Sequence, residues 1–358
     1  MSHPLSAFGW DDRVAALFTL VDVGGDVAPG RVIRMDRGSC LVAVGGGTTR
    51  ANPYALASRQ AGVTDDPVTG DWVAVVDDSS EGTVVVAILP RHSTISRRDS
   101  NEDAVTEQVL AANVDIVAAV CPLDRPFAEN RLERFLTMAW ESGGMPAIIL
   151  TKADAAETAE AAAATAETAA ALAADIDVYL TSATRGIGLD DLRTLIAPGL
   201  TLVLIGQSGA GKSTLVNSLI GRDAQETKAV RKGDSRGRHT TTTRDLIPMP
   251  GGGVLLDTPG LRSLALWDAE AAVADTFPDI EALAAGCRFR DCRHEAEPDC
   301  AVRAAALDGT LERRRFESYR KLEKEIAALE RQKDVRARRE AGRTFGRSMR
   351  EVQKFKKR

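Results

Sequence analysis

The central part of the chain reads Gly206-Gln207-Ser208-Gly209-Ala210-Gly211-Lys212-Ser213-Thr214, the pattern G-x-x-x-x-G-K-S-T. An apolar run over residues 201–205 precedes it, and apolar residues at helical spacing over 215–220 follow it, so it lies between an expected strand and an expected helix. Glycines let successive backbone N–H groups face a phosphate, and a helix N-terminus adds partial positive charge. Lys212 would reach the outer phosphates, and the hydroxyl of Ser213 would bind Mg²⁺. The agreement of strand, loop and helix favours a nucleoside triphosphate site over a chance glycine turn.

Two polar motifs at the ends of expected strands upstream indicate the base. Thr151-Lys152-Ala153-Asp154 follows the apolar run 147–150 and has the form T-K-x-D, and Thr181-Ser182-Ala183 follows the run 178–180. GTPases mostly have N-K-x-D at the first position, so Thr151 replaces the usual Asn. The carboxylate of Asp154 can accept two hydrogen bonds from guanine, a pattern that adenine does not offer. Either motif alone could be an ordinary turn, but together they favour guanine; an ATP-using enzyme is the alternative.

A third motif lies downstream of the glycine loop. The apolar run 254–256 leads into Asp257-Thr258-Pro259-Gly260, a D-x-x-G pattern in which Asp257 would hold the Mg²⁺ shell and the Gly260 N–H would meet the γ-phosphate. The guanine motifs precede the glycine loop, which is the reverse of the usual order. The sequence therefore predicts a circularly permuted GTPase domain. Because the segment after Gly260 leads directly into the C-terminal part, we expect nucleotide state to affect the position of that part.

The segment from Lys232 to Arg244 is polar and contains four consecutive threonines. One of them would complete the Mg²⁺ shell in the GTP state, and Thr241 is the candidate. Leu261 stands where many GTPases have a glutamine that orients water, so we expect slow intrinsic hydrolysis. His239 is the candidate catalytic replacement, although a solvated loop histidine fits the sequence equally well.

The N-terminal region combines a short amphipathic segment with several expected strands. Strand-like runs at 31–34, 39–44, 71–76 and 83–89 are separated by turn clusters without an intervening helix. They predict a small β-barrel of the oligonucleotide-binding (OB) type, with another small barrel or sandwich as the alternative. Trp72 could stack on a base or belong to the core. Residues 90–98 are expected to be a linker, after which alternating strands and helices predict a mostly parallel sheet covered on both faces.

A cluster of metal-ligand residues follows the expected GTPase domain. Cys287, Cys292, His294 and Cys300 lie within fourteen residues, in a setting rich in Arg and Asp. Three thiolates and one imidazole suit a closed tetrahedral structural zinc site, and so polar a segment is a poor place for incidental buried cysteines. Cys40 and Cys121 lie in or beside apolar runs, and we expect both to be core residues.

Composition limits the remaining possibilities. The chain has 358 residues and a formal net charge of −5, yet residues 301–358 contain 19 Lys and Arg against 9 Asp and Glu. Such a basic end could contact polyphosphate or be a solvated charged helix. No apolar run is long enough to span a membrane, and the N-terminus has no secretory pattern. Five cysteines in a chain of this length do not suggest a disulfide framework, so we expect a cytoplasmic protein. We also expect it to be a monomer.

These motifs together closely resemble the circularly permuted GTPases of the RsgA (YjeQ) family. The resemblance covers nearly the whole chain, including the barrel, the permuted motif order and the Cys-Cys-His-Cys set. Shorter stretches also match the family, namely Ile88-Leu89-Pro90-Arg91, Gln108-Val109-Leu110-Ala111-Ala112-Asn113-Val114-Asp115 and Gly237-Arg238-His239-Thr240-Thr241-Thr242.

The resemblance implies a GTPase that acts late in the assembly of the small ribosomal subunit. It implies binding to 16S ribosomal RNA through the barrel and the zinc domain, hydrolysis of GTP to GDP stimulated by the 30S particle, and a catalytic role for His239. A nucleotide-gated RNA-binding module with incidental hydrolysis is the alternative. The expected organisation is an N-terminal extension (1–25), an OB-like barrel (26–98), a circularly permuted GTPase domain (99–264), an α-helical zinc-binding domain (265–340) and a basic tail (341–358).

Overall fold

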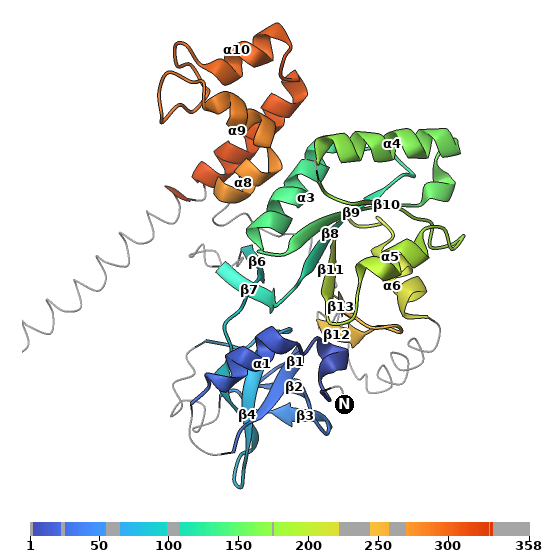
Figure 1. Cartoon of the computed structure of the whole chain (residues 1–358), viewed down its shortest axis with the longest axis vertical. Coiled ribbons are helices and arrows are strands. Elements are labelled where there is room, and N and C mark those ends of the chain that lie inside the picture. The colour runs from blue at the N-terminus through green and yellow to red at the C-terminus, as the bar shows by residue number, and fades with distance from the viewer. Residues whose placement is uncertain are drawn as a thin grey trace, which may run out of the picture. The chain divides into compact units, whose positions relative to one another are not determined.

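The computed structural model describes residues 3–22, 26–54, 65–98, 107–173, 175–221, 244–257, 270–328 and 330–331 (Figure 1). The chain divides into two units. The first comprises residues 1–96 and 109–264, and the second comprises residues 97–108 and 265–358. The expected positions of His239, Thr241 and Gly260 lie outside the described residues.

Five strands form the N-terminal barrel: β1 (Ala28–Asp36), β2 (Ser39–Val44), β3 (Gly47–Ala51), β4 (Trp72–Asp78) and β5 (Gly82–Ile88). β1 pairs with both β2 and β4, β2 pairs with β3, and β4 pairs with β5. The ring closes at Asn52, whose N–H donates to the Thr83 carbonyl at 2.9 Å. Small and β-branched side chains, among them Val32, Val42 and Val73, fill the interior.

The predicted barrel is confirmed, with two differences in its elements. The glycine-rich stretch expected to be only a turn begins a further strand, β3, which supplies the edge that closes the ring. The expected linker over 90–98 contains β6 (Thr94–Arg98), which pairs with β7 (Glu107–Ala112) in a separate two-stranded sheet. Trp72 is only 4% exposed, and the guanidinium carbon of Arg31 lies 4.8 Å from its ring centre, so it is a core residue.

The central sheet of the first unit has the order β10-β9-β8-β11-β13-β12. Its strands are β8 (Ile116–Pro122), β9 (Met145–Thr151), β10 (Val178–Leu180), β11 (Thr201–Ile205), β12 (Asp245–Pro248) and β13 (Val254–Asp257). All pairs are parallel except β12 with β13. The chain thus enters at β8, runs outward to the β10 edge, and returns to β11 beside its starting strand.

Helices cover both faces of this sheet (Figure 1). α3 (Glu129–Glu141) and α4 (Ala159–Leu172) pack on one face, and α5 (Leu189–Leu195) and α6 (Lys212–Ile220) pack on the other. Alternate residues of β8 point to opposite faces, so Ala118 and Val120 join the core under α5 and α6 while Ala119 joins the core under α3 and α4. α4 consists of Ala, Glu, Thr and one Leu, and it buries Ala162 and Ala169 along one side.

A buried arginine joins the barrel to the central sheet. Arg31 of β1 is 2% exposed, and its guanidinium donates to oxygens from four regions of the chain. Its acceptors are the Phe8 carbonyl, the Gly70 carbonyl at 3.3 Å, and, both at 2.9 Å, the Asn113 carbonyl and the Thr201 hydroxyl. Burial lowers the pKa of Arg31 to about 10, so it remains charged near neutral pH. Since these acceptors belong to separate segments, one side chain fixes their relative positions.

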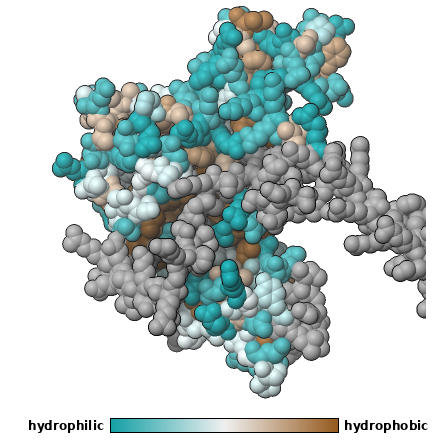
Figure 2. All heavy atoms as spheres, turned by 180° about the vertical axis from the view of Figure 1, so that it is seen from behind, coloured by the Kyte–Doolittle hydropathy of each residue, from teal (hydrophilic) through white to brown (hydrophobic). Residues whose placement is uncertain are grey.

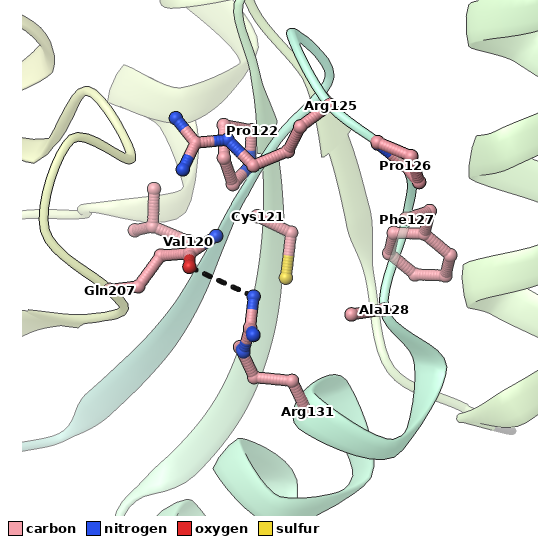
Figure 3. A pocket seen from close by; sticks show the side chains of 9 residues that line it. All are labelled: Val120, Cys121, Pro122, Arg125, Pro126, Phe127, Ala128, Arg131 and Gln207. Carbon is pink, nitrogen blue, oxygen red and sulfur yellow. Dashed lines mark hydrogen bonds between the residues drawn. The ribbon is translucent and has the colours of Figure 1, made fainter.

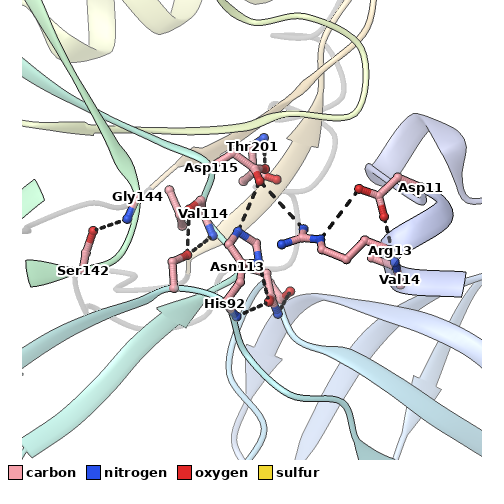
Figure 4. Close-up of polar contacts among 12 residues, drawn as sticks. Asp11, Arg13, Val14, His92, Asn113, Val114, Asp115, Ser142, Gly144 and Thr201 are labelled. Carbon is pink, nitrogen blue, oxygen red and sulfur yellow. Dashed lines mark hydrogen bonds and ion pairs between the residues drawn. The ribbon is translucent and has the colours of Figure 1, made fainter. Parts of the chain in front are cut away.

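Asp115, which precedes β8, is a second polar centre at this junction (Figure 4). Its carboxylate accepts from the Thr201 N–H at 2.8 Å and lies 3.2 Å from Nε2 of His92 and 4.0 Å from Nη2 of Arg13. Burial alone would raise the pKa of Asp115, but His92 and the Thr201 N–H hold it below its usual value. Arg13 comes from α1 (Asp12–Thr19), so the N-terminal helix also reaches the residue that precedes β8.

The second unit is helical. It contains α8 (Glu270–Thr276), α9 (Pro278–Ala284), α10 (Ala301–Asp308) and a helix over residues 313–328. Phe277 and Ile280 are fully buried, and Tyr319 lies edge-on to Phe277 at 5.6 Å. Arg315 pairs with both carboxylate oxygens of Asp279, at 2.7 and 2.6 Å. The described surface of this unit, at the top of Figure 2, is mostly hydrophilic, in keeping with a small core. Of the helices in the described part of the chain, none has the length and apolar character needed to cross a membrane.

Replacing Arg31 by Met should destabilise the first unit, because the carbonyls of Gly70 and Asn113 would stay buried without their donor. We expect the free energy of unfolding to fall by about 3 kcal/mol, measured by urea denaturation. Arg34→Met is the matched control on the same strand, since Arg34 makes only a half-buried pair with Asp36 at 3.1 Å and should cost at most about 1 kcal/mol. Equal losses for the two variants would contradict the role of Arg31.

Candidate functional site

The glycine loop lies between β11 and α6. α6 begins at Lys212, and Gly211 precedes it with φ of 88°, a left-handed conformation that suits glycine. A Cβ at Gly206 would lie 2.6 Å from the Val120 carbonyl oxygen, so a larger residue would push the loop away from β8. The loop therefore leaves the sheet closely packed and ends at a helix N-terminus, the geometry of a phosphate-binding loop.

Lys212 folds back over this loop. Its ammonium donates to the carbonyls of Gly206 at 2.6 Å and Gln207 at 2.9 Å. Ser213 and Thr214 are exposed in the first turn of α6, at the same end of the helix. A cation and two hydroxyls thus gather at the helix N-terminus, where a phosphate with its Mg²⁺ would be stabilised.

The T-K-A-D motif follows β9 and is fastened directly to the glycine loop. Thr151 is 4% exposed, and its hydroxyl donates to the Ala210 carbonyl at 2.6 Å. Lys152 adopts φ of 61°, and its ammonium donates to the Gly209 carbonyl at 2.7 Å. A threonine hydroxyl therefore links the two motifs at the position where the usual sequence has an asparagine.

The Thr181-Ser182-Ala183 motif meets the T-K-A-D motif through hydroxyl groups. The Ser182 hydroxyl donates to Oδ1 of Asp154 at 2.5 Å, and the Thr184 hydroxyl donates to Oδ2 at 3.1 Å. The Ser182 hydrogen bond is the main cause of an Asp154 pKa below its usual value. The Ala153 N–H donates to the Thr181 carbonyl at 3.0 Å. Asp154 is thus an exposed, ionised acceptor in a fixed orientation, as recognition of guanine requires.

Asp257 ends β13, and β13 pairs in parallel with β11, so Asp257 lies at the same edge of the sheet as the glycine loop. The nucleotide motifs that fall on described residues are therefore brought to one edge. Three polar residues at this edge were not predicted from the sequence: Asp124, Arg125 and Arg131. Their place after β8 was a usable signal, because ligands of parallel sheets bind at the carboxyl ends of the strands.

A small hollow lies beside the glycine loop, between the end of β8 and the start of α3 (Figure 3). Arg131 of α3 donates to Oε1 of Gln207 across this hollow at 2.9 Å. The thiol of Cys121 lines its wall, and burial raises the pKa of that thiol to about 12, so Cys121 is an unreactive neutral thiol. The prediction that Cys121 is buried is confirmed, as it is for Cys40.

A possible metal site lies in the second unit. The donor atoms of Cys287, Cys292, His294 and Cys300 lie within 4.8 Å of one another. The Cys287 and Cys300 sulfurs are 3.9 Å apart, and Nδ1 of His294 is 3.7 and 3.3 Å from them. Tetrahedral zinc with Zn–S bonds of ~2.3 Å would set its sulfur ligands about 3.8 Å apart, so this donor set fits such an ion.

The backbone supports the same cluster. Burial alone would raise the pKa of Cys287, but the N–H groups of Val302 and Ala301 bring it below its usual value. Those N–H groups belong to the N-terminus of α10, which stabilises a thiolate. His294 is buried with φ of 54°, a turn that directs its ring toward the sulfurs. These four residues can therefore hold a metal ion.

Residues 88–267 match the family model described as RsgA GTPase, and residues 201–335 match one described as 50S ribosome-binding GTPase. The chain is 46% identical over 350 residues to the small ribosomal subunit biogenesis GTPase RsgA of Streptomyces avermitilis, covering 97% of this chain and 92% of that protein. It is 44% identical over 343 residues to the protein of the same description from Syntrophotalea carbinolica, covering 93% of this chain and 92% of that protein.

Two solved structures share the fold. YloQ, described as a circularly permuted GTPase, has a TM-score of 0.60 and 26% identity, covering 85% of this chain and 96% of that one. YjeQ from Thermotoga maritima has a TM-score of 0.63 and 22% identity, covering 84% of this chain and 99% of that one. The predicted circular permutation is therefore confirmed both by the strand order and by these likenesses.

Replacing Thr151 by Val tests the link between the base motif and the glycine loop. The side chain keeps its shape but leaves the Ala210 carbonyl without its donor, so we expect GDP affinity to fall about fivefold, measured by fluorescence titration. Thr168→Val is the control, because that hydroxyl makes a similar 2.9 Å bond on the exposed side of α4. Wild-type affinity in Thr151→Val would refute the link.

Proposed function

The chain belongs to the RsgA GTPase family, and we propose that it acts as a GTPase in the biogenesis of the small ribosomal subunit. The observation that carries the proposal is the direct fastening of the T-K-A-D loop to the phosphate loop through Thr151 and Lys152. That contact makes base recognition and phosphate binding parts of one site. The role in small-subunit biogenesis is proposed because the relatives are described as small ribosomal subunit biogenesis GTPases.

Each motif has a proposed role in binding GTP. Asp154 would accept from the N1–H and amino group of guanine, and the backbone of Ser182 and Ala183 would face its oxygen. The loop from Gly206 to Gly211 would surround the phosphates, with Lys212 on the outer ones. Mg²⁺ would be bound through Ser213 and Asp257, with Thr241 completing its shell. Gly260 would donate its N–H to the γ-phosphate.

Hydrolysis would depend on the partner particle. We expect His239 to lie beside the γ-phosphate when the particle is bound, since Leu261 cannot orient a water molecule. The 30S subunit and its 16S RNA are the proposed partners, contacted through the barrel and the second unit. The metal at Cys287, Cys292, His294 and Cys300 would be zinc, which stabilises that unit and has no open position for chemistry.

GTP hydrolysis by the purified protein should rise by at least about tenfold when 30S subunits are added, whereas ATP should be hydrolysed slowly with or without them. Phosphate release measures both. His239→Ala should bind 30S subunits as the wild type does and lose the stimulated rate. If wild-type hydrolysis is indifferent to 30S subunits while binding persists, the protein is a nucleotide-gated RNA-binding module.

Asp154→Asn should reduce the preference for GTP over ATP on the order of 100-fold, because an amide cannot accept both guanine hydrogen bonds. Competition between the two nucleotides for the purified protein measures the preference. An unchanged preference would move the assignment to an ATP-using enzyme.

Purified protein should contain about one zinc per chain by elemental analysis, and Cys300→Ala should lose most of it. The second unit should then unfold at lower temperature, since metal binding adds to the folding free energy. Cys121→Ala, which removes a buried thiol of the first unit, should keep its zinc. Full zinc content in Cys300→Ala would disprove the assigned ligand set.

A further inference from the structure

Asp124 lies at the start of the loop that leaves β8 and binds two cations from different parts of the site. Its Oδ2 accepts from the Lys152 ammonium at 2.5 Å, and its Oδ1 accepts from Nε of Arg125 at 2.8 Å. Nη2 of Arg125 adds a longer contact to Oδ2 at 3.3 Å. Arg125, followed by Lys152, holds the pKa of Asp124 well below its usual range, so the carboxylate is ionised at neutral pH.

Both cations also lie against the phosphate loop. The Lys152 ammonium donates to the Gly209 carbonyl at 2.7 Å. Nη2 of Arg125 would be 3.7 Å from a Cβ placed on the same glycine. Asp124 therefore belongs to a polar network that also contains Lys152, Arg125 and the Gly209 carbonyl.

The backbone of Lys152 makes such an anchor useful. Its φ of 61° places a long side chain in the left-handed region, which costs free energy outside glycine. The ammonium donates to a neutral acceptor on the phosphate loop, the Gly209 carbonyl, and to a charged acceptor, Asp124. A charged acceptor makes the stronger hydrogen bond, so Asp124 contributes most to holding the side chain across the loop.

We propose that Asp124 is a positioning residue for nucleotide binding, which acts by holding Lys152 across the phosphate loop so that the base motif and the loop keep one fixed spacing. The inference rests on the proposed binding of GTP at this site. Asp124 itself does not touch the nucleotide. Removal of the Asp124 side chain weakens the binding of GDP and GTP alike. It leaves the hydrolytic step of bound GTP unchanged, because the contacts of Asp124 lie on the base side of the phosphate loop.

Replacing Asp124 by Ala tests the proposal. We expect the Kd for GDP and the KM for GTP in 30S-stimulated hydrolysis to rise about tenfold, the loss of one charge-assisted hydrogen bond, with kcat within about twofold of the wild type. Asp124→Asn keeps one oxygen that can accept from Lys152, so this variant should lose less nucleotide affinity than Asp124→Ala. Asp190→Ala is the control, because Asp190 makes an ion pair with Arg193 at 2.6 Å on the exposed surface of α5.

A double-mutant cycle with Lys152→Met separates positioning from general destabilisation. If Asp124 acts through Lys152, adding Asp124→Ala to Lys152→Met should change GDP affinity no further. The proposal would be overturned if the double variant lost GDP affinity by the product of the two single losses. It would also be overturned if Asp124→Ala bound GDP within twofold of the wild type. Should Asp124→Ala fail to fold, the same cycle with Asp124→Asn decides. Failure of the wild-type protein to bind GDP would instead overturn the proposed function.

Discussion

The parallel pairing of β9, β8 and β11 is the constraint on which the site depends. Pro122 of β8 lies opposite Thr151 of β9, and Ala119 lies opposite Ile205 of β11. Parallel neighbours end at the same edge of a sheet, so these pairings set the T-K-A-D loop beside a phosphate loop that follows it by more than fifty residues in sequence. The hydrogen bond from Thr151 to Ala210 becomes possible only through this register.

Circular permutation changes the chain order without changing those pairings. The chain passes through the base motifs first, and the strand that carries the phosphate loop enters last among the parallel neighbours of β8. The start of that strand is held at the opposite edge by Arg31 and Asp115, which bind the hydroxyl and the N–H of Thr201. The two ends of β11 therefore have different tasks: one joins the barrel to the sheet, and the other presents the phosphate loop.

Arg31 shows why the contacts between the barrel and the central sheet could not be predicted from the sequence. Arg31 lies in an expected strand of alternating residues, and nothing in its neighbours marks it as buried. Its acceptors are mainly backbone carbonyls, which every residue carries, so no motif could point to them. β3 and β6 were missed for a related reason, since their glycine and polar residues become strands only when a partner strand supplies the hydrogen bonds. The Cys-Cys-His-Cys cluster, by contrast, was evident because its ligands are chemically specific and close in sequence.

The sequence by itself determined the family, the permuted order of the motifs, the barrel and a Cys/His cluster that could hold a metal ion, because each depends on residue types at short spacings. Tertiary structure alone decided that a threonine hydroxyl links the base motif to the phosphate loop, that Asp124 holds Lys152, and that Arg31 binds acceptors from four segments. Asp124 and Lys152 are separated by 28 residues. Such contacts depend on strand register, side-chain direction and burial across distant segments, and these are properties of the packed chain that no local pattern encodes.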